Sequence, residues 1–196
     1  MEPTTARFEA FSDGVFAIAA TLLVLEFSTT SGSDLGHQLL HQWQSYLAYV
    51  TSFLTIGIIW MNHHHTVSLL GRTDRTFQFV NILLLMTIAF LPFPTKLVAQ
   101  YLGSDGEKAA ALTYSATFVV MAALHQLWWQ YARRSRRLVA PETPDSALEA
   151  VDRAYIVGVP MYGLVFLVAF FSPLAAVLLT FAIAAFYLPS AALFDR

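Results

Sequence analysis

The chain has 196 residues, of which 57% are hydrophobic and 12% are charged, with a net charge of -2. This composition is typical of a membrane protein rather than a soluble domain, and the slight negative charge argues against nucleic acid as a partner. Cysteine is absent, which excludes disulfides and thiolate metal sites.

The first predicted element is an apolar helix from about Phe8 to Phe27, roughly long enough to cross a bilayer. Asp13 lies more than one turn inside this helix, where an ionisable group is costly unless it has a partner or faces water. Arg7 and Asp13 are six residues apart and therefore lie on different faces of the helix, so we expect each to contact another helix. Because this run carries acidic residues at both ends and no basic region precedes it, no cleavable signal peptide is expected.

Five further apolar segments follow, which predicts an all-α membrane protein with six transmembrane helices in one domain over residues 1–196. The predicted spans are 8–27, 43–70, 77–102, 108–131, 154–171 and 174–193. Polar connections are expected at 28–42 and, as the longest, at 138–149. Pro160 and Pro189 predict a kink or an early end in the last two spans.

The distribution of basic residues predicts the orientation. If the N-terminus is cytoplasmic, nine basic residues fall on the inner side and two on the outer side, as the positive-inside rule requires. We therefore expect a multi-pass protein of the cell membrane with both termini in the cytoplasm. The inner residues are Arg7, Arg72, Arg75, Arg133, Arg134, Arg136, Arg137, Arg153 and Arg196, and the outer ones are Lys96 and Lys108.

This topology gathers unusual polar side chains near the cytoplasmic ends of the first three spans. They are Ser12, Asp13, Trp60, Asn62, His63, His64, His65 and Asn81. One interpretation is a set of interhelical hydrogen bonds, each worth about 0.6 to 2 kcal/mol; the other is a functional site such as a proton relay. Consecutive histidines on a helix point about 100° apart and cannot all bind one metal ion, so neither a metal site nor a cofactor is expected.

The first span also carries a stripe of residues at helical spacing, made of Phe11, Gly14, Ile18, Thr21 and Leu25. Packing or lipid contact explains such a stripe at least as well as a pore does. On spacing alone, contact with protein or lipid is the favoured interpretation.

Several of these residues together resemble the signature of the transmembrane protein 175 family, the endosomal and lysosomal potassium channels with prokaryotic relatives. The resemblance covers the first three spans, and the single six-span unit is similar to the prokaryotic form. The residues that carry it are Arg7-x-x-x-Phe11-Ser12-Asp13, Trp60-x-x-His63-His64, Asn81 and Phe90-Leu91-Pro92-Phe93-Pro94.

The resemblance implies a homotetramer whose four first helices line a central pore for potassium ions, and no enzymatic activity. It assigns the gate to Ile18, a hydroxyl ring to Thr21 and a second apolar ring to Leu25. It also implies a set of residues that brace the pore helix, namely Arg7, Phe11, Ser12, Asp13, Trp60, His63, His64 and Asn81. A secondary transporter, or a proton-conducting protein that uses the Asp13 and histidine cluster, is the alternative.

Overall fold

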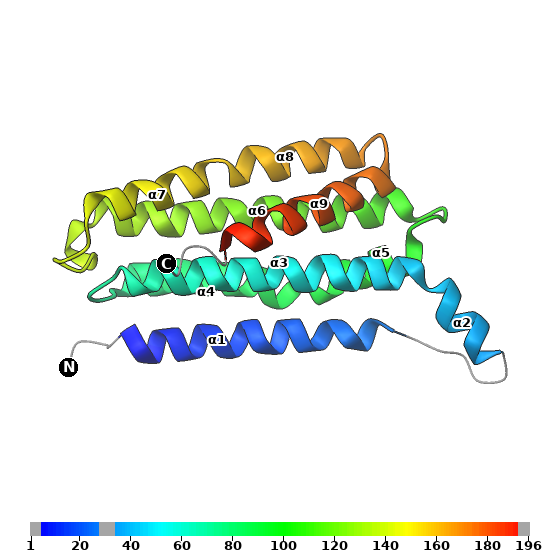
Figure 1. Ribbon diagram of the computed structural model, residues 1–196, viewed down its shortest axis with the longest axis horizontal. Coiled ribbons are helices and arrows are strands. Elements are labelled where there is room, and N and C mark those ends of the chain that lie inside the picture. The colour runs from blue at the N-terminus through cyan, green and yellow to red at the C-terminus, as the bar shows by residue number, and fades with distance from the viewer. Residues whose placement is uncertain (1–4, 28–33, 192–196) are drawn as a thin grey trace.

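The computed structural model describes residues 5–27 and 34–191, and within these ranges the regular structure is helical apart from one isolated bridge between Leu70 and Val139. Most helices run nearly parallel along one long axis (Figure 1). The elements are α1 Thr5–Leu22, η1 Leu23–Glu26, α2 Leu35–His41, α3 Trp43–Ser68, α4 Arg75–Phe90, α5 Pro92–Tyr101, α6 Glu107–Arg134, η2 Arg136–Leu138, α7 Asp145–Ile156, α8 Gly158–Ala169 and α9 Pro173–Ala191. The predicted all-α class is confirmed for the described residues.

Four helical segments in the described ranges are long and apolar enough to cross a membrane. They are Thr5–Leu25, Arg75–Tyr101, Glu107–Arg134 and Asp145–Ala169. A shorter apolar helix covers Pro173–Leu188, and α3, with 26 residues, is about 39 Å long at 1.5 Å per residue. The lengths of these helical segments are compatible with six membrane crossings per chain, and that number stays a prediction.

The first helix lies along one side of the bundle, against α3 and α4 (Figure 1). Its buried residues are Ser12, Phe16 and Ala19, and Leu23 extends that face into η1. These positions follow the helical spacing of four, three and four residues. One face of α1 therefore packs against the other helices of the chain, and the opposite face is left exposed in this single chain.

The predicted third span is broken into α4 and α5. The break lies at Leu91, just before Pro92, which is the first residue of α5. Proline lacks a backbone N–H and is tolerated in the first turn of a helix but not in its interior. Pro94 also lies in that first turn, so the two prolines end one helix and begin the next.

Two predicted polar connections contain helices. Segment 28–42 includes α2, whose N-cap Asp34 accepts a hydrogen bond from Gly36 N; residues 28–33 are outside the described part of the chain. The predicted linker 138–149 is wrong in its second half, because α7 begins at Asp145, directly after Pro144. The helical segment at the predicted fifth span, 154–171, thus begins earlier, at Asp145, and is interrupted at Val157, three residues before Pro160. Pro160 cannot donate to the carbonyl of Ile156, which explains the interruption.

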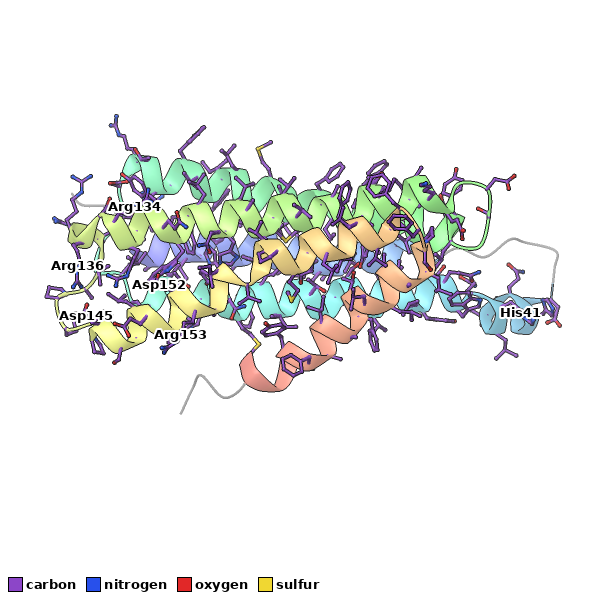
Figure 2. The ribbon with its side chains drawn as sticks, turned by 90° about the horizontal axis from the view of Figure 1, so that it is seen from above. His41, Arg134, Arg136, Asp145, Asp152 and Arg153 are labelled. Atoms are coloured by element: carbon purple, nitrogen blue, oxygen red, sulfur yellow. The ribbon has the colours of Figure 1, made fainter. Side chains whose placement is uncertain are left out.

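One end of the bundle is rich in arginine (Figure 2). Arg134, Arg136 and Arg153 lie there, and His41 lies at the opposite end. α5, which carries Lys96, and the start of α6, which carries Lys108, lie toward the same end of the bundle as α2 (Figure 1). Among the described residues, arginines therefore gather at one end of the long axis and the two lysines lie on elements toward the other; which end is cytoplasmic stays a prediction.

Acidic residues hold this arginine-rich end together. Asp74 caps α4 by accepting a hydrogen bond from Phe77 N at 2.9 Å, and its other oxygen accepts from Tyr131 Oη at 2.9 Å and Arg137 Nη2 at 2.8 Å. Desolvation raises the pKa of Asp74, but the hydrogen bonds and the Arg137 charge outweigh it, so the pKa is lowered. Asp152 on α7 similarly accepts from Trp129 Nε1 and Arg133 Nε on α6. These contacts join α4, α6, η2 and α7.

Candidate functional site

A chain of buried hydrogen bonds connects α1, α4 and α3. The Ser12 hydroxyl donates to the Phe8 carbonyl at 3.1 Å and accepts from Asn81 Nδ2 at 3.0 Å. Asn81 Oδ1 lies 2.8 Å from His63 Nε2, which must therefore carry the proton. Ser12, Asn81 and His63 are at most 1% exposed. The predicted polar residues of three separate spans thus supply one another's hydrogen bonds.

The His63 ring is enclosed by aromatic side chains. It stacks on Trp128 of α6 with centroids 4.7 Å apart and an interplanar angle of 8°. Phe8 and Phe16 of α1 contact it at centroid distances of 6.1 and 5.4 Å. Trp128 is fully buried and had no role in the sequence prediction. His63 therefore holds α1 both through Asn81 and through ring packing against Phe8 and Phe16, while Trp128 packs it against α6.

Two further contacts tie the same stretch of α1 to α3, at the surface of this single chain. Trp60 Nε1 donates to Asp13 Oδ1 at 2.8 Å. His64 Nδ1 lies 2.6 Å from Glu9 Oε1, and their side chains are 56% and 28% exposed. The Trp60 and His64 rings also stack at 6.1 Å, as their four-residue spacing predicts. Asp13 therefore contacts another helix, as expected, whereas the Glu9 contact was not predicted.

The three consecutive histidines point to different surroundings. His63 is buried against Asn81, His64 faces Glu9 of α1, and His65 borders a small hollow beside α7. Within the described residues, no group of three histidine, cysteine, aspartate or glutamate side chains is placed to hold a metal ion. The divergence that the helix geometry predicts is confirmed.

The residues of the predicted stripe lie on the uncovered face of α1 and η1. Phe11, Ile18 and Leu25 are 60%, 61% and 68% exposed in this single chain. Thr21 is also exposed, and its hydroxyl donates to the Ile18 carbonyl at 2.9 Å. Arg7 is exposed near the start of the same helix. The stripe is thus opposite the face that carries Ser12, Phe16 and Ala19.

The site includes residues that the sequence analysis missed. Trp128 and His125 on α6 extend the aromatic cluster, and His125 lies 6.5 Å from the His63 ring, centroid to centroid. Tyr155 of α7 donates to the Asn62 carbonyl at 3.1 Å. Asn62 thus contributes a backbone oxygen to the α3–α7 contact. An isolated histidine inside an otherwise apolar span was the available signal for His125.

Comparisons with known proteins agree on one family. The family model described as the endosomal/lysosomal potassium channel TMEM175 matches residues 7–92, which include every residue of the site on α1, α3 and α4. A potassium channel of Chamaesiphon minutus is 40% identical over 188 residues, covering 93% of each chain. A potassium channel of Streptomyces collinus is 42% identical over 172 residues, covering 86% of this chain and 84% of the relative.

The fold comparison extends beyond the region of the family match. The crystal structure of a lysosomal potassium-selective channel TMEM175 homologue from Chamaesiphon minutus superposes with a TM-score of 0.87 at 38% sequence identity. It covers 95% of this chain and 97% of the solved chain. Because the family model, the sequence identity over nearly the whole length and the fold all agree, the chain belongs to the TMEM175 family.

Proposed function

We propose that this protein is a potassium-preferring channel that conducts passively through a central pore lined by α1. The observation that carries the proposal is the uncovered stripe of α1 and η1, which lies opposite the face that anchors α1 and whose pore-lining members are Ile18, Thr21 and Leu25. Four such stripes around a shared axis would form a continuous wall of mainly apolar side chains. The potassium channels that match nearly the whole chain support the same assignment.

The gate in this proposal is a ring of Ile18 side chains. An apolar constriction narrower than a hydrated ion loses its water and blocks conduction. Thr21, one turn further along, would form a hydroxyl ring. Its proton is donated to the Ile18 carbonyl, so the oxygen lone pairs remain available to a cation. Leu25 would form a second apolar ring toward the outer side.

The anchoring contacts give a means of moving this gate. Ser12, through Asn81 and His63, and Asp13, through Trp60, hold the cytoplasmic half of α1 on α3 and α4. Arg7, Phe11 and His64 complete the proposed set of bracing residues. A change in these contacts would shift α1 and alter the width of the Ile18 ring.

The proposed assembly is a homotetramer of one six-span domain in the cell membrane, with both termini cytoplasmic. Its partners are potassium ions, the lipid bilayer and other copies of the chain. The segregation of arginines to one end supports this orientation. Arg196, one of the nine basic residues that the orientation prediction counts, lies outside the described residues. The proposed function includes no catalytic step.

Ion flux from liposomes that contain the purified protein tests the proposal. We expect passive potassium flux that needs no second substrate and exceeds sodium flux under equal gradients. Flux that requires a coupled ion would favour a secondary transporter. Proton flux without potassium flux would favour the proton-conducting alternative that uses the Asp13 and histidine cluster.

A further inference from the structure

A groove of about 530 Å³ runs between α1 and α3 and is open on the surface of the single chain. Apart from Asp13 its lining residues are apolar or aromatic, and three of them are small: Ala17, Ala20 and Gly57. A Cβ added at Gly57 would meet no atom within 4 Å beyond its own helical backbone. Small residues let a neighbouring helix approach closely inside a membrane, so the groove can receive another helix.

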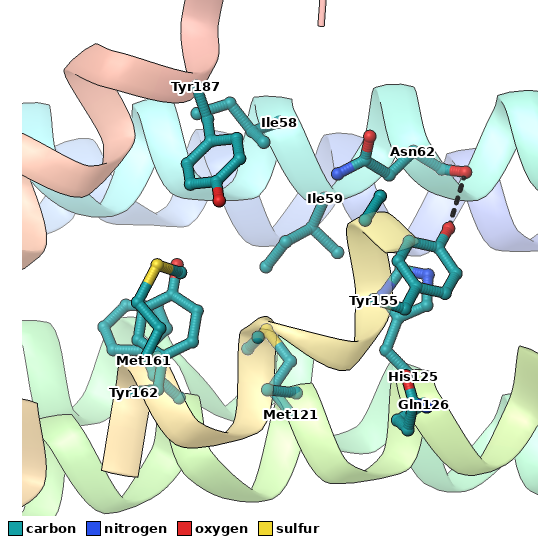
Figure 3. A pocket seen from close by; sticks show the side chains of 14 residues that line it. Ile58, Ile59, Asn62, Met121, His125, Gln126, Tyr155, Met161, Tyr162 and Tyr187 are labelled. Atoms are coloured by element: carbon teal, nitrogen blue, oxygen red, sulfur yellow. Dashed lines mark hydrogen bonds between the residues drawn. The ribbon is translucent and has the colours of Figure 1, made fainter. Parts of the chain in front are cut away.

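The opposite side of α3 is already used by the chain itself. Ile58, Ile59 and Asn62 face α6 and α8 across a cavity of about 100 Å³ (Figure 3). The Tyr155 hydroxyl donates to the Asn62 carbonyl on that side. α3 therefore has one side that packs inside the bundle and another that its own chain leaves open beside α1.

A ridge of exposed apolar side chains lies on α4, on the other flank of the chain. Phe79 and Met86 are 60% and 62% exposed, and Phe90 is 47% exposed. These residues are seven and four positions apart, so they form one stripe of the helix. α4 and α9 lie along opposite edges of the bundle (Figure 2), and Leu188 of α9 borders the groove. The groove and the α4 ridge therefore face in different directions.

Two contacts fix the register between α1 and α4. Asn81 of α4 donates to Ser12 of α1, which is 69 residues earlier in the chain. Phe77 contacts Phe8 with the same offset, at 5.5 Å between ring centroids. Because α1 and α4 run in the same direction (Figure 1), residues with this offset lie at one depth along the bundle.

This register places the α4 ridge at the depth of the groove. Met86 is level with Ala17, in the middle of the α1 wall that extends from Asp13 to Ala20. All copies of a membrane protein insert in one orientation, and a rotation about the membrane normal keeps every residue at its depth. A neighbouring copy therefore presents Met86 at the level of Ala17. Since the two surfaces are on different flanks, the contact repeats from copy to copy and can close a ring.

Charges at the inner end of the groove also fit a second copy. Asp13 and Glu9 lie one turn apart there and contact Trp60 and His64. Arg75 is exposed at the start of α4 and makes no hydrogen bond or ion pair with the described residues. In a neighbouring copy it is about 4.5 Å from the level of Glu9 at 1.5 Å per residue, within the reach of its side chain. The two carboxylates would repel an anionic lipid headgroup, so charge favours a second copy as the occupant.

We propose that the groove between α1 and α3 binds the α4 ridge of a second copy of this chain, with Met86 against Ala17 and Gly57. This inference rests on the assembly of several copies proposed above and names the two surfaces that join them. The contact leaves the stripe of α1 that carries Ile18 facing the shared axis.

Disulfide cross-linking in membranes tests the pairing, and the absence of native cysteine makes it specific. Ala17→Cys combined with Met86→Cys should give a ladder of linked chains on denaturing gels after oxidation. Ala17→Cys combined with Phe79→Cys is the matched control, since Phe79 lies on the same ridge but about 10 Å away in depth. We expect no ladder from the control. A ladder from both pairs, or from neither, overturns the proposal.

Gly57→Leu fills the groove from within the chain, where a Cβ has open space. We expect native mass spectrometry to show a shift from assemblies to single chains at equal protein concentration. Gly163→Leu on α8, where an added Cβ also meets nothing within 4 Å, is the control and should assemble like the wild type. Unchanged helix content in circular dichroism shows that both variants are folded. An assembly that survives Gly57→Leu overturns the proposal.

The assembly and this interface can fail separately. A wild-type protein that is a single chain in bilayer nanodiscs would contradict the proposed function together with the interface. Copies that assemble without the Ala17–Met86 cross-link would overturn the interface alone. So would a phospholipid that stays bound to the wild type and is lost in Gly57→Leu while the assembly is unchanged.

Discussion

The indole Nε1 of Trp60 donates a hydrogen bond to Oδ1 of Asp13 at 2.8 Å. Both residues also border the groove of about 530 Å³ between α1 and α3. A carboxylate inside an apolar helix is thus paired with the neighbouring helix rather than with its own. The pair belongs to the same stretch of α1 as the buried Ser12 contact, so it adds a second, more exposed link between α1 and the bundle.

Trp60→Phe tests this link, because it keeps an aromatic ring and removes the N–H donor. We expect the free energy of unfolding to fall by about 1 kcal/mol, the net value of one hydrogen bond. Thermal unfolding in detergent measures the change. Trp43→Phe, at the start of the same helix and 47% exposed, is the matched control. Equal stability of the two variants would show that the Asp13 contact contributes nothing.

Asn81 is the central residue of the buried chain, and its loss should be more damaging. Asn81→Leu leaves the His63 Nε2 proton without its acceptor and removes the donor to Ser12, so we expect a loss of about 2 to 3 kcal/mol. Ser12→Ala breaks one of these bonds and should cost about 1 kcal/mol. Because both changes affect one network, the double variant should be close to Asn81→Leu alone. Additive losses in denaturant unfolding would contradict a connected network.

The sequence predicted two features well: the positions of the long apolar helices, and the contacts among polar side chains that lie inside apolar helices and therefore need one another as partners. The boundaries of α3 and α6 lie within a few residues of their predicted spans, and Ser12, Asn81 and His63 meet as the topology required. The Glu9–His64 contact was missed, because it depends on the register of α1 against α3, which composition does not encode.

The first half of the fifth span was missed for a different reason. Residues 145–156 are amphipathic and charged, so a search for apolar length treats them as a linker. Their buried side chains, Leu148 and Val151, are three residues apart and pack with Tyr155 in the aromatic cluster near Trp129. This spacing is the helical signal that the sequence contained. Pro141 and Pro144, which are typical of connections, led to the assignment of this stretch as a linker.

The Asp74 contacts predict a specific acid sensitivity. Its pKa is lowered in the folded chain, so the ionised carboxylate stabilises the fold above the ordinary aspartate pKa, and this contribution is lost as the pH falls through the folded value. Asp74→Asn should therefore lower the melting temperature at pH 7 and reduce the further loss between pH 7 and about pH 3. Melting curves at several pH values measure both effects.

The control for this acid sensitivity is Asp145→Asn. Asp145 pairs with Arg136 at 2.7 Å, but its side chain is 64% exposed, against 23% for Asp74. An exposed ion pair contributes little, so this variant should resemble the wild type at every pH. A pH dependence that is equal in the two variants would contradict the role assigned to Asp74.

Ile18→Asn tests the proposed gate. A polar amide in the constriction favours water there, so passive potassium flux into liposomes should rise several-fold. Ile82→Asn is the matched control, since it makes the same substitution on the exposed face of α4, where Ile82 is 48% exposed. We expect the control to conduct like the wild type. If Ile18→Asn leaves the flux unchanged while Ile82→Asn raises it, α1 does not form the gate.

Thr21→Ala tests the proposed hydroxyl ring. The Thr21 hydroxyl donates to the Ile18 carbonyl, so its oxygen can replace a water that a cation loses on entering the apolar neck. Potassium has the lower charge density and loses hydration water more readily than sodium, so removing these oxygens should reduce the preference for potassium. Liposome flux under potassium or sodium gradients measures the ratio of the two fluxes.

Thr113→Ala is the control. It removes a hydroxyl that makes the same kind of contact on α6, to the Ala109 carbonyl at 2.8 Å, and should leave the ratio unchanged. Thr21→Ser keeps the oxygen and should restore the preference; a ratio that is identical in all four proteins would remove Thr21 from the ion path.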